Sequence, residues 1–587
     1  MSACADPADR LLVEGWTTSL SIPSRGDLPP WDRVVLRLGG SAAGAWFIAL
    51  SVAWVVLGLV GHDPWKPDEA HTFGVVLDFL ERRDWVVPAL AGEPFVEKPP
   101  LFSIVAGGMA YLLGGALPLH DAARLATGLF VGLALLFVGL TGREIYGRRH
   151  GMVAVLVMIG CVGPIARMHQ LVVDVALVAG VAIGIYGLAL SRRLVWGGGV
   201  ALGVGAACAF LSKGLLGPGW LALTAVALPV FPPWRTRRYG LALVVAAIVA
   251  VLPAAVWMSA LYSRSPTLFA EWLITNNFGR FLGFTRVGPH NAPAFYALVL
   301  PWYAFPALPL AAWAIWTAWR HRELKHGYVG LLLPLLLATV ILGVLALASD
   351  SRDLYLLPLL VPLSLLAAQG IGRLPAIGAM ALSLAARWAA GLLALLLWVG
   401  WMALMTGVPS QLHAVLLAYQ PGFAPKIHWA FLAFALGATA LGVHVLRRAS
   451  LDGGTAVTQW TVAMTLCWCL IATLWAPYLN AGKSYRTMIE SLARELPDAG
   501  CVASVHLGEG QRGLLDYFAG VETVRLEAQP QAACPALLVQ GWRDDGAPAP
   551  APGWTPVWEG ARPGDERELY RLYRRGVPAA QPLVRFP

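Results

Sequence analysis

The chain has 587 residues, of which 57% are hydrophobic and only 13% are charged. A soluble domain cannot hide so much apolar surface, so the composition excludes a soluble protein and predicts that most of the chain lies in lipid. The formal net charge of +9 is typical of Arg-rich cytoplasmic loops beside anionic lipid, so we expect membrane lipids and no nucleic acid among its partners.

Apolar runs long enough to cross a bilayer follow one another from residue 42 to residue 477. The first run begins near Ala42, after a mixed-charge leader over residues 1–41, so we expect no cleavable signal peptide and place this leader in the cytoplasm. The sequence predicts an all-α integral membrane bundle of about thirteen spans, since each span needs about twenty apolar residues. The spans lie near residues 42–61, 122–141, 151–166, 173–191, 197–212, 214–231, 239–260, 295–318, 327–348, 355–371, 386–405, 427–446 and 457–477.

The segment 101–117 is apolar, but it is short and rich in glycine. If it crossed the membrane, basic loops such as Arg143–Arg149 would face outside. If it stays at the interface, all the basic loops fall on the cytoplasmic side, which is the usual arrangement. We therefore predict that 101–117 does not cross, that residues 62–121 form the first external loop, and that the C-terminus lies outside.

Residues 478–587 have mixed polarity and predict a small external α/β domain. Strand-like runs occur at 501–506, 522–526 and 536–540, a helix-like run at 511–518, and a Pro/Gly/Ala-rich loop at 546–553. Cys501 and Cys534 are the only cysteines of this domain, so an oxidising compartment would permit a disulfide between them. Two buried free thiols are the alternative, because the distance between the two strands is unknown from sequence.

Each of the first five external loops carries a charged residue close to the membrane. An ionisable residue at this position marks a functional site by default, and a ring of them predicts a site at the external mouth of the bundle. These residues are Asp68, Glu69, Glu97 and Lys98 in the first loop, Asp174 in the second, Lys213 in the third, Arg280 in the fourth, and Arg352 with Tyr355 in the fifth.

The acidic members of this set have two interpretations. Asp68 and Glu69 are either a solvated pair beside the membrane or a general base with an electrostatic partner. Asp174, at the head of a span, is costly unless it is paired or faces an aqueous cavity, which favours a functional role.

The cationic members also have plainer alternatives. The run Glu97–Pro100 is either a helix start or a rigid holder that keeps Lys98 as a phosphate clamp. Lys213 can snorkel to the interface, Arg280 and Arg352 can bind lipid headgroups, and Tyr355 can belong to an aromatic belt. The scattered histidines are expected to be structural rather than metal ligands: His62, His71, His169 and His290.

The order of motifs in the first external loop resembles the membrane glycosyltransferases with the C-type (GT-C) fold. The loop reads Asp68-Glu69-Ala70, then RDWVVP at 83–88, GEPF at 92–95 and EKPP at 97–100. The nearest groups are the lipid A aminoarabinose transferases and their protein O-mannosyltransferase relatives. Matching pieces continue to residue 371: Arg167 with Asp174, Ser212–Gly214, Gly279–Phe281 and Arg352–Pro358.

The resemblance implies a sugar on a polyprenyl phosphate as the donor, and a lipid or glycan acceptor such as lipid A or another envelope glycan. It implies a bacterial inner-membrane enzyme whose site faces the periplasm and which inverts the anomeric carbon. Asp68 would be the principal catalytic acid, with Asp174 and Glu69 as further acids of the site. The donor phosphate would be bound by Lys98, Lys213, Arg280, Arg352 and Tyr355.

Departures from the family pattern leave the sugar and the acceptor open. His71 and Thr72 stand where these transferases usually have Arg-Tyr, and Asn276 with Asn277 stands where they often have an acid or His. Asn276, Asn277 and Glu97 are therefore further site candidates. With so many fixed cations no cofactor is required, although the sequence leaves binding of a divalent metal open. A polyprenyl-linked lipid flippase, a protein O-glycosyltransferase and a membrane scaffold are the competing classes.

Overall fold

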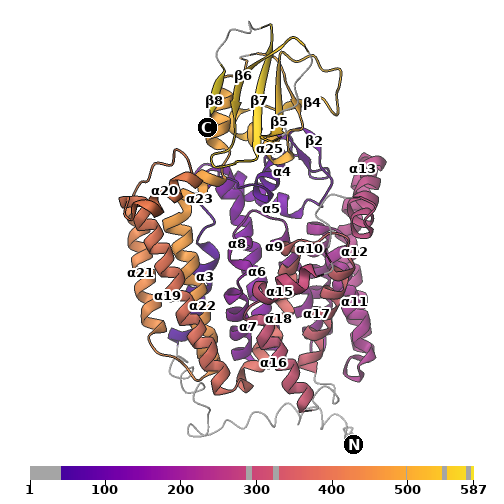
Figure 1. Ribbon diagram of the computed structural model, residues 1–587. Helices are drawn as coiled ribbons and strands as arrows, with labels where there is room; N and C mark the ends of the chain where they lie inside the picture. Colours follow the sequence, from indigo (N-terminus) through magenta and orange to yellow (C-terminus); the bar gives the residue numbers. More distant parts are fainter. Residues whose placement is uncertain are drawn as a thin grey trace, which may run out of the picture.

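The computed structural model describes residues 41–285, 292, 294–321, 329–497, 499–544, 552–576 and 583–586. The predicted leader, most of the predicted loop 546–553 and His290 lie outside the described residues. Within the described part, a bundle of apolar helices carries a small sheet domain at one end (Figure 1). This arrangement confirms the predicted fold class, a helical membrane bundle with a C-terminal α/β domain.

The bundle and its external loops are built mainly from helices. In chain order they are α3 (Ser41–Val56), α4 (Asp68–Arg82), α5 (Leu101–Leu113), α6 (Leu119–Tyr146), α7 (Arg148–Gly160), α8 (Pro164–Arg167), α9 (Asp174–Leu190), α10 (Val195–Lys213), α11 (Leu216–Ala227), η2 (Leu228–Val230), η3 (Pro232–Trp234), α12 (Arg237–Arg264), α13 (Pro266–Ala270), η4 (Glu271–Gly279), α14 (Arg280–Leu282), α15 (Phe295–Tyr303), α16 (Ala307–Arg320), α17 (Val329–Leu347), η6 (Asp353–Leu359), α18 (Leu360–Gly370), η7 (Ile371–Arg373), α19 (Ala376–Thr406), α20 (Ser410–Tyr419), α21 (Trp429–Leu446), α22 (Gly453–Leu470), η8 (Ile471–Trp475) and α23 (Ala476–Lys483). A two-stranded hairpin, β1 (Ala89–Leu90) and β2 (Glu93–Pro94), lies in the first external loop.

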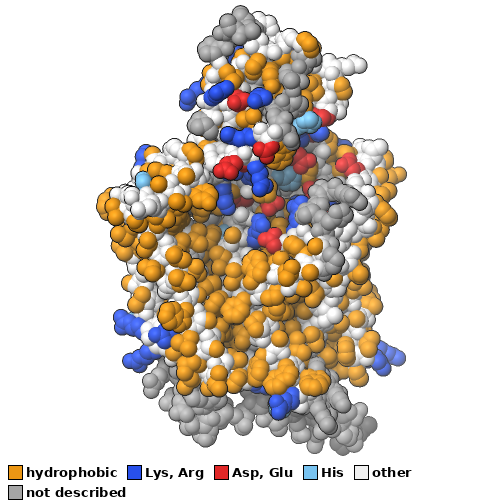
Figure 2. All heavy atoms as spheres, viewed as in Figure 1, with side chains coloured by type: hydrophobic (Ala, Val, Ile, Leu, Met, Phe, Trp, Pro, Cys, Tyr) orange, Lys and Arg blue, Asp and Glu red, His pale blue; other side chains and the backbone are white. Residues whose placement is uncertain are grey.

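Among the described residues, eight helices are long and apolar enough to cross a membrane. The bent pair α15 and α16, which meet at 96°, makes a ninth if it counts as one span. The other predicted spans coincide with shorter helices, α3, α7, α9 and α11. Figure 2 shows an apolar belt across the visible face of the bundle, with Lys and Arg side chains at the end opposite the sheet domain. This distribution follows the positive-inside rule.

Helix α5 starts and ends at the same end of the bundle. It begins directly after the Glu97–Pro100 run, and the chain then enters α6 at Leu119, where His120 Nδ1 lies 3.0 Å from the Tyr517 hydroxyl of the sheet domain. That 101–117 does not cross the membrane stays a prediction.

The sheet domain contains α24 (Arg486–Ala493), α25 (Glu509–Ala519) and six strands: β3 (Val502–Val505), β4 (Thr523–Arg525), β5 (Ala536–Trp542), β6 (Trp554–Gly560), β7 (Glu568–Arg575) and β8 (Val584–Phe586). The strand order is β4-β3-β5-β7-β6-β8, with parallel pairs β4–β3, β3–β5 and β6–β8. The predicted strands and helix correspond to β3, α25, β4 and β5. The prediction missed β6, β7 and β8.

Cys501 and Cys534 form a disulfide, which confirms that prediction. The bond joins the residue before β3 to the segment before β5, two strands that pair in parallel. Among the described residues, the free cysteines lie in the helices of the bundle or directly after them: Cys161, Cys208, Cys467 and Cys469.

The domain lies directly on α4. Helix α25 crosses α4 where Gly513 faces Gly74, and a Cβ atom on Gly513 would come within 2.8 Å of the Gly74 Cα atom. Such close contact of two helix backbones requires glycine at the crossing. Helix α4 is therefore held between the bundle and the domain, with its N-terminal residue Asp68 at the external mouth of the bundle.

Candidate functional site

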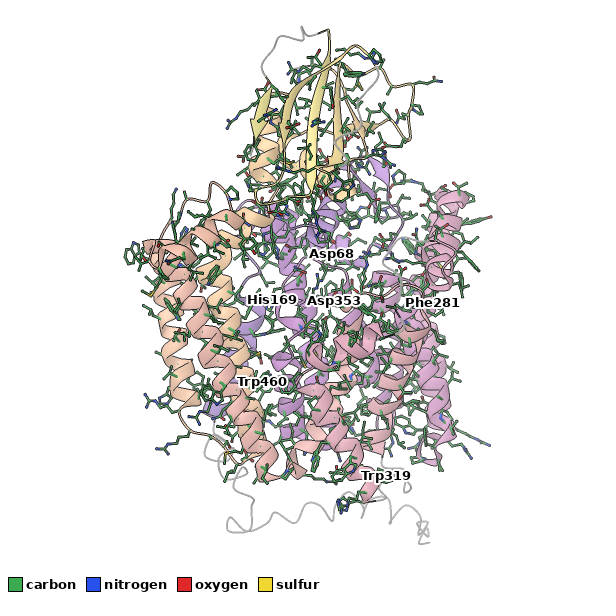
Figure 3. All side chains as sticks on the ribbon, viewed as in Figure 1. Asp68, His169, Phe281, Trp319, Asp353 and Trp460 are labelled. Atoms are coloured by element: carbon green, nitrogen blue, oxygen red, sulfur yellow. A yellow bond between two sulfur atoms is a disulfide. The ribbon has the colours of Figure 1, made fainter. Side chains whose placement is uncertain are left out.

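A cavity of about 360 Å³ lies at the external end of the bundle, beneath the sheet domain. Charged side chains gather in the hollow between that domain and the apolar belt (Figure 2), and Figure 3 places Asp68 there. Every predicted site residue except Glu69 lines the cavity: Asp68, Glu97, Lys98, Asp174, Lys213, Asn276, Asn277, Arg280, Arg352 and Tyr355. Residues that lie almost 290 positions apart in the sequence thus meet at one place.

Asp68 is the first residue of α4, and its carboxylate lies between two guanidinium groups. Its Oδ2 accepts a hydrogen bond from Arg167 Nη1 at 3.4 Å, and its Oδ1 lies 4.0 Å from Arg352 Nη1. Arg167 also donates to both oxygens of Asp353, at 3.1–3.2 Å. Arg167 was not among the predicted site residues. Its position in the apolar run PIARMHQLVVD could have indicated it, because an arginine in such a run marks a functional site.

A second group of charges lies around Arg280. Its guanidinium donates to Glu97 Oε1 at 2.5 Å, to Asp350 Oδ2 at 2.9 Å and to the Tyr355 hydroxyl at 3.2 Å. The Lys213 ammonium lies 4.3 Å from the centre of the Tyr355 ring. Tyr355 thus contacts both cations, Lys213 through its ring and Arg280 through its hydroxyl.

Two acids of the cavity hold cations in place. Lys213 donates a hydrogen bond to Asp174, which is itself buried at the start of α9. Glu97 Oε1, the acceptor of Arg280, also lies 3.8 Å from Lys98 Nζ. Asp174 and Glu97 therefore orient the lysine and arginine side chains that surround the cavity.

Glu97 and Lys98 stabilise each other's charged form. Burial raises the pKa of Glu97, but Lys98 and Arg280 outweigh this effect and hold it well below its usual range. Burial lowers the pKa of Lys98, but the negative charges of Glu97 and Asp174 outweigh this effect and raise it. At neutral pH the cavity therefore presents a fixed ammonium group beside the Arg280 guanidinium.

The rest of the cavity wall is apolar. It is formed by α11, by the segment that runs through η4 into α14, and by the external end of α17. A phosphate would fit the charged end, and a hydrocarbon chain would fit the wall between these helices. The apolar lining residues of the cavity are Val172, Val173, Leu215, Leu216, Trp220, Leu223, Phe278, Phe281, Val344, Leu345, Ala348 and Leu354.

Asn277 braces this wall. Its Oδ1 accepts a hydrogen bond from Leu215 N at 3.1 Å, and its Nδ2 donates to Trp272 O at 2.8 Å. These bonds tie η4 to the turn at Gly214, between Lys213 and α11. Asn276 lines the cavity beside it.

Glu69 lies outside the cavity, in contrast to its predicted place in the site. Its side chain is 1% exposed; one carboxylate oxygen accepts from Arg124 Nε at 2.8 Å and from Leu171 N at 2.9 Å. The other oxygen accepts from Trp65 N at 3.1 Å. Neighbouring residues on a helix point about 100° apart, so Asp68 faces the cavity while Glu69 faces the core.

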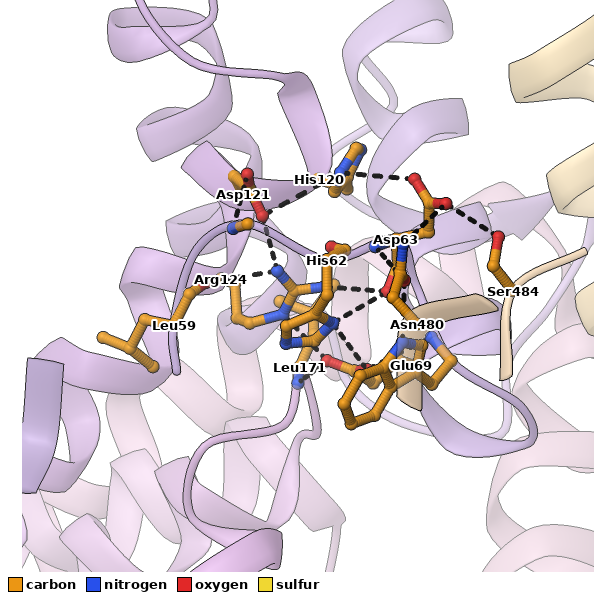
Figure 4. A network of polar contacts seen from close by, with 12 residues as sticks. Leu59, His62, Asp63, Glu69, His120, Asp121, Arg124, Leu171, Asn480 and Ser484 are labelled. Carbon is orange, nitrogen blue, oxygen red and sulfur yellow. Dashed lines mark hydrogen bonds and ion pairs between the residues drawn. The ribbon is translucent and has the colours of Figure 1, made fainter. Parts of the chain in front are cut away.

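Arg124 is the centre of the polar network that Figure 4 shows. Its fully buried guanidinium binds Glu69 and Asp121, and it also donates to the backbone carbonyls of Leu59, His62 and Asp63 at 3.1–3.4 Å. The network thereby joins α6 to the loop before α4. It also joins α4, through Glu69, to the segment that leads to Asp174.

The described histidines of the predicted set differ in their location. His62 and His169 are buried and bonded to backbone carbonyls, which fits the expected structural role. His71 instead lines the cavity, one helical turn after Asp68. Burial and the nearby Lys98 lower the pKa of His71 to about 4, so its imidazole is neutral at neutral pH.

No family model matches the chain. Several proteins named undecaprenyl phosphate-alpha-4-amino-4-deoxy-L-arabinose arabinosyl transferase are similar to it. One from Pseudomonas fluorescens is 29% identical over 53% of this chain and 53% of its own length. One from Edwardsiella ictaluri is 29% identical over 61% of this chain and 64% of its own, and one from Sodalis glossinidius is 30% identical over 56% and 59%. The chain thus spans between half and two thirds of the length of these relatives.

Among solved structures, the chain is similar to ArnT from Cupriavidus metallidurans. The crystal structure of ArnT bound to undecaprenyl phosphate matches with a TM-score of 0.68 and 18% identity, over 91% of this chain and 98% of that one. The apo structure of the same protein matches with a TM-score of 0.67. The chain therefore has the membrane glycosyltransferase fold of ArnT and is similar in sequence to the aminoarabinose transferases, as the motifs of its first external loop implied.

Proposed function

We propose that the chain is a membrane glycosyltransferase that moves a sugar from a polyprenyl-phosphate donor to an acceptor on the external face. The observation that carries this proposal is the joining of an apolar wall to a cluster of fixed cations, with Asp68 beside them. The names of its relatives and the undecaprenyl phosphate named for ArnT support the same donor class.

On the donor side, the phosphate binds where Lys98, Lys213, Arg280 and Tyr355 converge. Cations fixed in this way stabilise the negative charge that develops on the phosphate as the bond to the sugar breaks. The acids that hold them, Glu97 and Asp174, keep these side chains in place before substrate arrives. We therefore propose that Asp174 orients Lys213 rather than transferring a proton.

On the acceptor side, Asp68 is the general base. It takes the proton of the attacking oxygen while that oxygen bonds to the anomeric carbon and the phosphate departs. Arg167 and Arg352 hold the Asp68 carboxylate from two directions. Attack on the face opposite the phosphate would invert the anomeric carbon.

The remaining parts of the proposal concern location, sugar and acceptor. We propose that the protein lies in the bacterial inner membrane with the cavity facing the periplasm, which the basic end of the bundle opposite the cavity supports. The names of the relatives support 4-amino-4-deoxy-L-arabinose as the first sugar to test. Lipid A or another envelope glycan is the proposed acceptor.

We propose that no metal is required, because Lys98, Lys213 and Arg280 already supply the positive charge that the leaving phosphate needs. Transfer by the purified protein should therefore be unchanged by EDTA. A loss of activity that Mg²⁺ or Mn²⁺ restores would contradict this part of the proposal.

The test is transfer in proteoliposomes that contain the purified chain, undecaprenyl phosphate-4-amino-4-deoxy-L-arabinose and lipid A. Mass spectrometry should show lipid A with an added pentosyl mass, and Asp68→Asn protein should give none. Transfer to a peptide but not to lipid A would favour the protein O-glycosyltransferase alternative. Movement of the donor across the bilayer without transfer would favour the flippase alternative. A flippase is expected to have ionisable groups at mid-span, whereas here they lie at helix ends.

A further inference from the structure

The sheet domain brings a carboxylate next to His71, a residue of the cavity wall. Glu509 is the first residue of α25, and its neighbour Gly510 lies against α4: a Cβ atom on Gly510 would come within 3.1 Å of Ala70 Cβ. This contact holds Glu509 over His71, with Oε2 3.6 Å from Nε2. His71 lines the cavity, so the pair lies where the domain meets the site.

Glu509 differs from the other charged groups at this boundary. The domain binds the first external loop through complete ion pairs: Glu522 with Arg82 at 2.6 Å, Glu568 with Lys66 at 2.6 Å and Arg525 with Glu93 at 2.7 Å. Within the described residues, the Glu509 carboxylate has no lysine or arginine within ion-pair distance, and its side chain is 53% exposed. Its charge is thus available to a ligand.

The facing imidazole is also incompletely bonded. His71 Nε2 is buried and has no hydrogen-bond partner among the described residues. A buried polar atom without a partner is costly, so its presence in a cavity wall points to a group that a ligand supplies. The lowered pKa of His71 keeps the imidazole neutral, so one ring nitrogen can accept a hydrogen bond.

The carboxylates that line the cavity are already engaged. Each lies within hydrogen-bond distance of a lysine or arginine: Asp68 of Arg167, Glu97 and Asp350 of Arg280, and Asp174 of Lys213. Unlike these carboxylates, His71 and the neighbouring Glu509 have no lysine or arginine within ion-pair distance among the described residues, so both can accept a hydrogen bond from a substituent of a bound sugar. His71 lies one helical turn after Asp68 on α4, close enough to Lys98 for that charge to lower its pKa.

We propose that His71 and Glu509 form a subsite for a hydrogen-bond-donating substituent, a hydroxyl or an ammonium group, on the sugar of the polyprenyl-phosphate donor. This inference rests on the proposed function and adds the sheet domain to the part of the protein that selects the donor. In this subsite, Glu509 contributes to the choice of sugar and takes no part in the reaction.

The experiment compares binding of lipids with and without the sugar to the full-length protein in detergent. The probes are undecaprenyl phosphate, undecaprenyl phosphate-4-amino-4-deoxy-L-arabinose and undecaprenyl phosphate-mannose. The variants are Glu509→Ala, Glu509→Gln and His71→Phe. The matched control is Glu522→Ala, which removes a carboxylate of the same domain that binds Arg82 at the other end of α4.

We expect the wild-type protein to bind one sugar-bearing lipid more tightly than undecaprenyl phosphate. Glu509→Ala and His71→Phe should weaken binding of that lipid by about fivefold or more, which is the effect of one lost hydrogen bond. Their affinity for undecaprenyl phosphate should stay within about twofold, and Glu522→Ala should match the wild type with every lipid. Glu509→Gln should retain part of the preference if the substituent is a hydroxyl and lose it if the substituent is an ammonium group.

The inference would be overturned if Glu509→Ala weakened the binding of all three lipids equally, or weakened the binding of none. A wild-type protein that binds undecaprenyl phosphate but prefers neither sugar-bearing lipid would also overturn it, while leaving the proposed donor class intact. A wild-type protein that binds none of the lipids would contradict the proposed function itself, and the subsite would fall with it.

Discussion

Replacing Arg124 by Leu should destabilise the protein strongly. The guanidinium is fully buried and donates to two carboxylates, at 2.8 Å from Glu69 and 2.7 Å from Asp121, and to three backbone carbonyls. A leucine would leave Glu69 buried with no cation in contact. Removing one partner of a buried pair costs about 3–5 kcal/mol, because the remaining charge loses its compensation.

The measurement is unfolding of the detergent-solubilised protein, followed by tryptophan fluorescence. Arg193→Leu is the matched control, since Arg193 also pairs with a glutamate, Glu144, but its side chain is 61% exposed. An exposed pair contributes only about 0–1 kcal/mol, so the control should unfold close to the wild type. If Arg124→Leu lowers stability no more than Arg193→Leu does, the network around Glu69 does not have the stabilising role derived from its geometry.

The same network has a consequence for turnover. Glu69 binds the backbone of Leu171 and follows Asp68 directly, so it fixes α4 relative to the segment that leads to Asp174. Glu69→Gln keeps the shape of the side chain but removes its charge. The folded variant should lose turnover by about tenfold or more, because small displacements of reacting groups are costly. Its donor KM should change little, because the cations that bind the donor phosphate lie elsewhere. An unchanged kcat would refute this positioning role.

Three further results are expected. Asp68→Asn should abolish transfer without unfolding the protein, and near-normal turnover of the folded variant would contradict its role as the base. Lys98→Ala should weaken use of the donor by about tenfold or more, since a contact between a cation and a phosphate contributes about 1.5–3 kcal/mol; a change in acceptor affinity alone would place Lys98 on the acceptor side. A cysteine at Arg148, in a cysteine-free background, should resist an impermeant thiol reagent added outside the cell, and its labelling would overturn the predicted topology.

Composition and helix periodicity were enough to predict the bundle and the ring of charges at its mouth. Asp174 and Lys213 stand at the ends of apolar runs and Arg280 lies in a loop between two runs, and the helices of one bundle place such ends and loops at two levels only. Because the basic loops determine which level is cytoplasmic, the charges at the other level had to lie together. The meeting of Lys98 with Arg280 therefore follows from topology, without knowledge of packing.

Other parts of the site depend on helix rotation and tertiary packing, which the sequence does not determine. Asp68 and Glu69 are adjacent, and only the packing of α4 decides which of them faces the cavity. Arg124 lies in an apolar helix with no motif around it, and its partners come from three separate segments. The strands β6 to β8 were missed for a different reason: Pro556 and a register shift interrupt β6, and β8 has only three residues.

The burial of α4 explains why the sheet domain belongs to the site rather than standing apart from it. An external helix beside a bundle normally exposes one face to water, yet α4 is buried at eight consecutive positions, from Thr72 to Phe79, and also at Glu69 and Ala70. One face packs on α5 and α6, and α25 covers the opposite face at the crossing of Gly74 with Gly513. The N-terminal residue of this enclosed helix is Asp68. The domain therefore fixes the position of the proposed base through α4, in the same contact that brings Glu509 over His71.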